Sequence, residues 1–174
     1  MTFSTLAEDV LFYTRLYRPE GDYLKTVEED FHQIEPHLPQ SVDSILDIGC
    51  GLAVIDVFLK RKYPKATLSL LDSDGTKASY GWSEDYRAYG SRDKTNSYLK
   101  ENGITVDNWF PVGHSGLLAA DLVISLLAWG FHFPLKTYNV EGLCVADLRL
   151  NKEPERGTVI ARELKFNRCL FRLP

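Results

Sequence analysis

The sequence has little of several features that define whole classes of protein. It holds only three cysteines in 174 residues, an odd number that fits no disulfide framework and no Cys-x-x-Cys metal spacing. Twenty basic residues face 24 acidic ones, which leaves a net charge of -4 and no positive surplus for binding a phosphate backbone. The most apolar stretch, 117–135, is interrupted by Asp121, His132 and Pro134, as is typical of a buried strand and a loop rather than a membrane span. We therefore expect a reducing, cytoplasmic compartment, and neither nucleic acid nor a membrane is favoured as a partner.

Internal repeats, low-complexity runs and linkers rich in Gly, Ser or Pro are also absent, so nothing in the composition divides the chain. With 44% hydrophobic and 25% charged residues, the chain is large enough to bury a core. We expect a single domain over residues 1–174, with leading helices over 1–40 and an alternating α/β core over 41–174.

The alternation of apolar periods predicts the order of the elements. Helical spacing predicts a first helix at 5–17 and a second from Leu24 to Ile34, which Pro36 and Pro39 end. The expected strands are 44–48, 66–72, 106–112, 121–127 and 142–148, and the expected helices between them are 54–63, 94–102 and a short one that opens at Pro134. The tail, 153–174, predicts one more helix and a final strand at 168–173, or equally a hairpin.

Strands that consist of continuous Ile, Leu and Val, separated by helices, are typical of a mostly parallel sheet. Right-handed crossovers then place helices on both faces of that sheet. The sequence thus predicts a doubly wound, three-layer α/β/α fold with six or seven strands.

The sequence Asp-Ile-Gly-Cys-Gly, residues 47–51, joins the first of these strands to a helix. In open α/β sheets the ligand binds beyond the carboxyl ends of the strands, where this turn offers backbone N–H groups and a helix N-terminus. Gly49 and Gly51 allow a tight turn and a close approach to the backbone. A dinucleotide fingerprint would need a glycine at Val54, which disfavours NAD. About twenty residues later, Asp72 ends the second strand, where a carboxylate suits two ribose hydroxyls.

This turn resembles the first motif of class I S-adenosylmethionine (SAM)-dependent methyltransferases, Asp-x-Gly-x-Gly-x-Gly, with Ala53 at the third glycine. The resemblance extends over about 41–148 and is loosely to sugar and other small-molecule O-methyltransferases. It implies SAM as the cofactor. The residues that it implies for cofactor binding are Asp47, Gly49, Cys50, Gly51, Asp72, Ser73 and Ser125. The alternative is that the glycines serve only the close packing of strand and helix.

In this family the residues after the fourth strand border the transferred methyl group. His132 is the candidate catalytic base, because an imidazole titrates near neutrality and a hydroxyl acceptor must lose its proton. A histidine packed among aromatic neighbours is the equal alternative. Trp129 could stack on SAM or on the acceptor, although an aromatic beside a strand end is more often packing.

A second aromatic segment, 80–89, follows the expected ribose-binding acid. Trp82, Tyr86 and Tyr89 could form a wall for the acceptor, or the segment could be a helix packed on the sheet.

The sequence therefore predicts SAM-dependent methyl transfer to a small polar acceptor. The absence of an Asn-Pro-Pro-Tyr or Asp-Pro-Pro-Tyr sequence after the fourth strand and the acidic charge favour a hydroxyl oxygen. The alternatives are a SAM-binding domain or partner subunit without catalysis, an NAD-type oxidoreductase and a nucleic-acid methyltransferase. No metal is predicted, although a metal-dependent enzyme could assemble distant acids such as Asp121 and Asp147. Monomer and homodimer both stay open, because the final strand could be an edge that pairs with a second copy.

Overall fold

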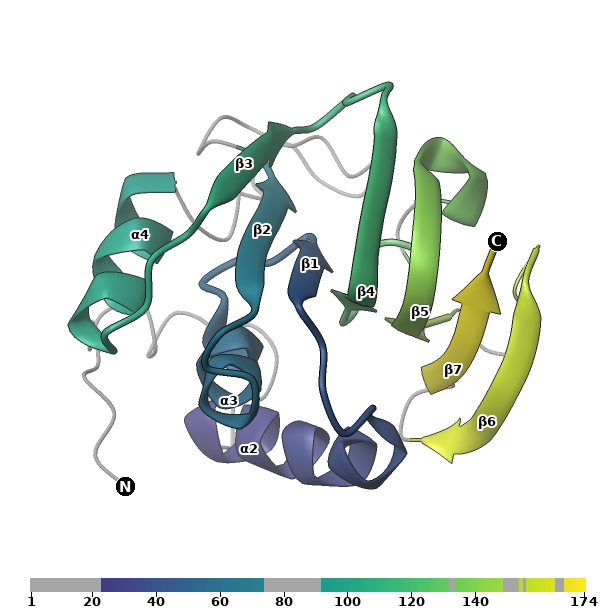
Figure 1. Cartoon of the computed structure of the whole chain (residues 1–174), viewed down its shortest axis with the longest axis horizontal. Coiled ribbons are helices and arrows are strands. Elements are labelled where there is room, and N and C mark those ends of the chain that lie inside the picture. The colour runs from purple at the N-terminus through teal and green to yellow at the C-terminus, as the bar shows by residue number, and fades with distance from the viewer. Residues whose placement is uncertain (1–22, 74–91, 132–133, 149–153, 155, 165–167) are drawn as a thin grey trace.

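Seven strands form one sheet in the computed structural model, which describes residues 23–73, 92–131, 134–148, 154, 156–164 and 168–174 (Figure 1). The strand order is β3-β2-β1-β4-β5-β7-β6. Neighbouring strands from β3 to β5 are parallel, and β7 is antiparallel to both of its neighbours. The strands are β1 Ser44–Ile48, β2 Thr67–Asp72, β3 Asn108–Pro111, β4 Leu117–Ser125, β5 Asn139–Asp147, β6 Thr158–Leu164 and β7 Arg168–Leu173. The predicted mostly parallel α/β sheet is confirmed.

Within the described part of the chain, three α-helices and two short 3-10 helices accompany the sheet. They are α2 Tyr23–Ile34, η1 Glu35–His37, α3 Val54–Lys62, α4 Arg92–Glu101 and η2 Leu135–Thr137. Pro36 lies in η1, directly after α2, and the chain leaves α4 through Gly103, whose φ is +75°, a conformation that glycine adopts readily. These elements confirm the expected helices apart from two: the one at 5–17, which lies outside the described residues, and the one in the tail, which is described below.

The two faces of the sheet are covered differently. Ile45 packs on one face with apolar residues of α2, α3 and α4, and Leu46 and Ile48 pack on the other, because successive side chains of a strand point to opposite faces. Phe31 of α2 and Phe58 of α3 stack with ring centroids 5.3 Å apart. Among the residues that the structure describes, the α-helices pack on the first of these faces. On the second face, the described residues that cover the sheet come from the connection between β4 and β5.

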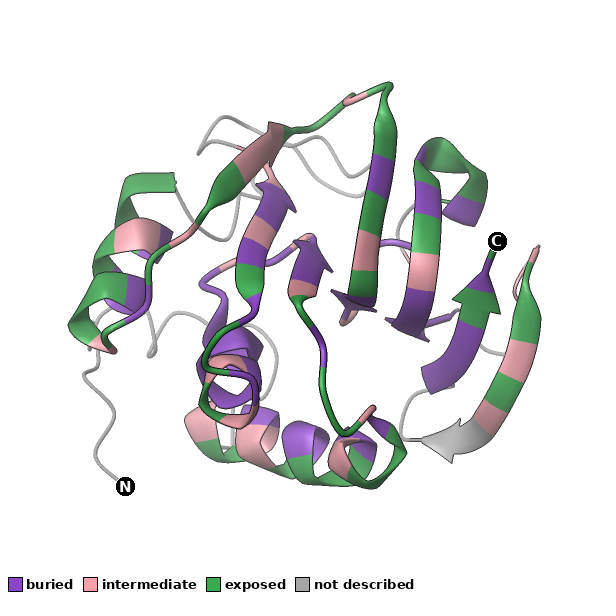
Figure 2. Ribbon diagram, in the orientation of Figure 1, coloured by how far each residue is buried: buried purple, intermediate pink, exposed green. Residues whose placement is uncertain are grey.

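Most residues of β1 and β7 are buried (Figure 2). In β1 four of the five residues are buried, and in β7 five of six. Continuous burial of this kind accounts for the runs of Ile, Leu and Val that identified the strands.

The tail forms a hairpin of β6 and β7, so the expected last helix is wrong and the hairpin alternative is confirmed. Thr158, Val159 and Ile160 open β6, and β-branched residues favour an extended chain. The register of β6 shifts twice along β7. Such shifts interrupt the regular alternation of side chains along a strand, so the sequence of this segment did not indicate a strand clearly.

None of the helices among the described residues is long and apolar enough to cross a membrane.

Candidate functional site

The order of the strands reverses between β1 and β4, which lie side by side. From β1 the chain runs to β2 and β3 on one side, and then returns to β4 on the other. Connections leave in opposite directions at such a point and open a crevice at the carboxyl ends of the strands. Two turns lie at this edge of the sheet: the glycine turn, residues 49–53, after β1, and the β4 turn, residues 126–131.

The glycine turn uses left-handed backbone three times. Gly49, Gly51 and Ala53 have φ values of +79°, +54° and +59°, so the third position of the motif is left-handed although it carries alanine. The Gly49 N–H donates to the Leu71 carbonyl at 2.7 Å. A Cβ on Gly49 would lie 2.2 Å from the Cβ of Ala128, which no real pair of side chains tolerates. Glycine is therefore required where the two turns meet.

The Asp72 carboxylate joins this turn to the end of β2. Its Oδ2 accepts a hydrogen bond from the Gly51 N–H at 2.6 Å. Its Oδ1 accepts one from the Ser73 N–H at 2.6 Å and one from the Ser73 hydroxyl at 3.2 Å. Burial raises the pKa of Asp72, and these donors partly offset the effect. A carboxylate offers about four acceptor sites, so a ribose diol that used both oxygens would displace one of these donors.

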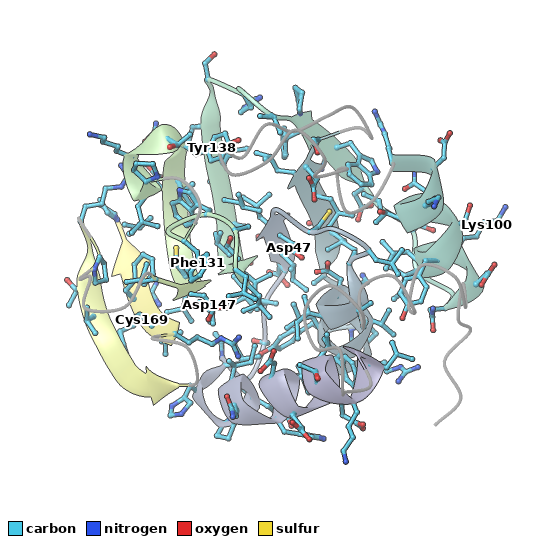
Figure 3. All side chains as sticks on the ribbon, turned by 180° about the vertical axis from the view of Figure 1, so that it is seen from behind. Asp47, Lys100, Phe131, Tyr138, Asp147 and Cys169 are labelled. Carbon is cyan, nitrogen blue, oxygen red and sulfur yellow. The ribbon has the colours of Figure 1, made fainter. Side chains whose placement is uncertain are left out.

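Two further carboxyl groups lie under the turn. Asp47 of β1, labelled in Figure 3, and Asp56 of α3 are 3% and 0% exposed. Burial, followed by the charge of Asp56 and a hydrogen bond with it, raises the pKa of Asp47 well above its ordinary range. Burial also raises the pKa of Asp56 to about 7. A hydrogen bond between two carboxyl groups needs a proton on one of them. The interaction raises the pKa of Asp47 and lowers that of Asp56, so Asp47 is the group that holds the proton.

Sequence analysis did not single out Asp56, although a signal was present. The acid lies inside the run Val54–Leu59, whose members are all buried, and an ionisable residue in such a run needs a polar partner. Thr95 of α4 was also missed, and its hydroxyl donates to the Gly51 carbonyl at 2.7 Å. Cys50 is buried, and its Sγ lies 3.7 Å from the Gly51 carbonyl oxygen.

Ser125 ends β4 and links the two turns. Its hydroxyl donates to the Ile48 carbonyl at 2.7 Å and accepts from the Trp129 N–H at 2.8 Å. The residue is fully buried. Its predicted contact with the cofactor stays a prediction, whereas its contacts within the protein assign it a role in holding the β4 turn against β1.

Trp129 lies in the core rather than in the crevice. Its exposed fraction is 0%, its indole N–H donates to the Leu135 carbonyl at 2.9 Å, and its ring lies 6.5 Å from that of Phe171. The packing alternative describes it, and we no longer expect it to contact the acceptor. The other candidates for the acceptor side, His132, Trp82, Tyr86 and Tyr89, lie outside the described residues and stay predictions.

A buried charge network lies beside the β4 turn. Arg168 of β7 donates from Nε to Asp147 Oδ1 at 2.7 Å and from Nη2 to Asp147 Oδ2 at 3.1 Å, and its Nη1 lies 3.4 Å from Asp30 Oδ1 of α2. Asp147, labelled in Figure 3, also accepts from the Leu127 N–H at 3.0 Å. Burial raises the pKa of Asp147, and Arg168 opposes the effect.

The possible metal pair of the sequence analysis is wrong. Asp121 accepts from the N–H groups of Asp43 and Ser44 at 2.8 and 3.0 Å, at the amino end of β1. Asp147 lies at the carboxyl end of β5. Opposite edges of a sheet cannot share one ion.

No family model matches the chain, and no curated protein does either. Among solved structures, the chain is similar to the pyocyanin biosynthetic protein PhzM, with a TM-score of 0.53, 15% identity, and coverage of 95% of this chain and 61% of that one. It is also similar to a SAM-dependent methyltransferase from Clostridium acetobutylicum (TM-score 0.48, 15% identity, 79% and 55% covered). A third similar structure is the O-methyltransferase TomG from Streptomyces achromogenes, solved in complex with SAM. Its TM-score is 0.39 and its identity 15%, and the match covers 80% of this chain and 71% of that one.

The chain shares the fold of the PhzM structure, a class I methyltransferase-like α/β sheet. The chain spans less than two thirds of the length of the PhzM and Clostridium structures.

The residues at the carboxyl edge of this methyltransferase fold fit SAM. The glycine turn opens α3 at the point where the strand order reverses, and the Asp72 carboxylate lies at the turn with one acceptor site beyond its three hydrogen bonds. A tight glycine turn at the start of a helix and a carboxylate that accepts hydroxyl donors are the groups that a nucleoside with a charged amino-acid tail requires.

Proposed function

We propose that this protein binds SAM against the glycine turn and transfers its methyl group to a hydroxyl oxygen of a small polar molecule. The observation that carries the proposal is the hydrogen bond from the Gly51 N–H to Asp72 Oδ2. It places the carboxylate suited to a ribose directly at the turn where the strand order reverses.

Each part of the edge has a task in this proposal. Gly49 and Gly51 bring the backbone close to the ligand, and Asp72 orients the ribose by accepting its hydroxyl protons. When bound, SAM supplies an electrophilic methyl group. The chain has to align the acceptor oxygen behind that group and to receive the hydroxyl proton, which is the role proposed for His132.

A second candidate function is SAM binding without catalysis. It is supported by the position of Trp129 in the core, where its side chain is not available to an acceptor. Nucleic acid as the acceptor is disfavoured by the net charge of -4.

Isothermal titration calorimetry with S-adenosylhomocysteine (SAH) tests the cofactor proposal. We expect micromolar binding to the wild type and a loss of about tenfold or more for Asp72→Asn, because hydrogen bonds to a charged group contribute roughly 1.5–3 kcal/mol. The matched control is Asp107→Asn, since the Asp107 carboxylate also accepts a backbone N–H, that of Leu68 at 2.7 Å, at the start of β2. The control should bind as the wild type does.

Absence of SAH binding to the wild type would refute the proposal. Equal losses in both variants would mean that carboxylates stabilising β2 matter in general, and Asp72 would have no special role. A screen of sugars and phenols with methyl-labelled SAM then separates the two candidate functions, since binding without transfer to any acceptor supports the non-catalytic one.

We further propose a reducing, cytoplasmic setting, consistent with three free, buried cysteines, and a monomer or homodimer.

A further inference from the structure

We infer that Asp147 is a positioning residue for the cofactor turn: its carboxylate holds Leu127 in a left-handed conformation and so keeps the β4 turn pressed against Gly49. The inference rests on the proposed function, because it gives Asp147 a role in SAM affinity. Three contacts carry the inference. They are the hydrogen bond between Leu127 and Asp147, the ion pair that fixes the Asp147 carboxylate, and the contact of Ala128 with Gly49.

Leu127 is strained. Its φ is +57°, a region that residues with a branched side chain rarely adopt and that persists only where surrounding contacts enforce it. The contact present is the hydrogen bond from the Leu127 N–H to Asp147 Oδ2, at 3.0 Å. A charged acceptor makes this bond stronger than a bond to a neutral group.

The Asp147 carboxylate cannot turn away from Leu127. Both of its oxygens accept from Arg168, at 2.7 and 3.1 Å, and Arg168 is held from the other side by Asp30 at 3.4 Å. Asp147 and Arg168 are 0% and 1% exposed, so water does not compete for these donors. A bidentate pair fixes orientation as well as distance. One oxygen is thereby aimed at the N–H of the β4 turn.

The next residue transmits this geometry to the glycine turn. Ala128 lies so close to Gly49 that a Cβ placed on Gly49 would be 2.2 Å from the Cβ of Ala128. The β4 turn is closed behind it by the hydrogen bond from the Phe131 N–H to the Ala128 carbonyl, at 3.1 Å. If Leu127 relaxes to negative φ, the chain direction at Ala128 changes and the contact with Gly49 is lost.

The test is SAH titration of four variants. Asn at position 147 has one acceptor oxygen for three donors, so Asp147→Asn should weaken SAH binding about tenfold, or ~1.4 kcal/mol, as the fraction of competent turn falls. Adding Leu127→Gly should restore the affinity, because glycine adopts positive φ without help. Adding Leu127→Ala instead should not restore it. Leu127→Pro, which removes the N–H and imposes negative φ but leaves the ion pair intact, should also weaken binding.

Wild-type affinity in Asp147→Asn or in Leu127→Pro would overturn the inference. So would folded Asp147→Asn protein that Leu127→Gly does not rescue, because a purely structural ion pair predicts that outcome. If Asp147→Asn does not fold, the SAH affinity of Leu127→Pro tests the inference instead.

A measurement without ligand separates this inference from the proposed function. The Gly49 N–H donates to the Leu71 carbonyl, and its hydrogen exchange, followed by NMR, reports how firmly the turn is held. We expect faster exchange in Asp147→Asn and recovery with Leu127→Gly. If the wild type does not bind SAH, the proposed function fails, and the exchange result alone confirms or refutes the role of Asp147.

Discussion

The buried pair of Asp47 and Asp56 makes stability depend on pH in a direction opposite to that of most carboxylates. Asp56 is fully buried, and burial raises its pKa from 3.8 to about 7, whereas in the unfolded chain it titrates near its ordinary value. Between these values the folded state binds more protons than the unfolded state, so the free energy of unfolding falls as the pH rises. The stabilisation is complete below about pH 4 and lost above about pH 7.

The size of the effect follows from the same values. A tenfold change in proton affinity corresponds to about 1.4 kcal/mol. The rise in the pKa of Asp56 from 3.8 to about 7 therefore corresponds to a loss on the order of 4 kcal/mol, of which roughly 2–3 kcal/mol falls between pH 5 and pH 8. In Asp56→Asn the side chain at position 56 can no longer ionise, so this share of the pH dependence should disappear.

Urea denaturation of the two proteins at pH 5, 6, 7 and 8 measures this difference. Asp56→Asn should gain stability relative to the wild type as the pH rises, by roughly 2–3 kcal/mol over the series. Asp43→Asn makes the same change of net charge at an exposed position and should show no such trend. A stability difference between wild type and Asp56→Asn that stays constant from pH 5 to pH 8 would refute the raised pKa of Asp56.

Two further predictions concern the contact between the turns. Gly49→Ala should lower the free energy of unfolding by about 2–4 kcal/mol, from positive φ and from overlap with Ala128. Adding Ala128→Gly should recover only the part of the lost stability that comes from the overlap. Full recovery of the free energy of unfolding in urea denaturation would contradict a cost from the positive φ at position 49. Ser125→Ala should cost about 1–3 kcal/mol, because the Ile48 carbonyl and the Trp129 N–H lose their buried partner. An unchanged midpoint of thermal unfolding in that variant would show that these groups find other partners.

The local pattern of the sequence was enough to predict most elements and the position of the glycine turn after β1. Apolar runs at period two or 3.6 depend on neighbours within one segment, which is why β1, β2, β5 and α3 were predicted nearly to their ends. The glycine turn and Asp72 could also be predicted, because both are set by where a strand ends. The helix expected in the tail failed because β6 is an edge strand whose conformation depends on pairing with β7.

The partners of the buried charges could not be predicted in this way. Asp47 and Asp56 meet because α3 packs back onto β1, and Asp147 and Arg168 meet because the antiparallel β7 places them in register. The same packing took Trp129 into the core. Sequence alone determined most of the strands and helices and where the glycine turn lies, since local periodicity and strand ends carry that information. Only the tertiary structure decided how the buried acids are paired and what holds Leu127 against the turn, because those contacts join residues that are distant in the chain.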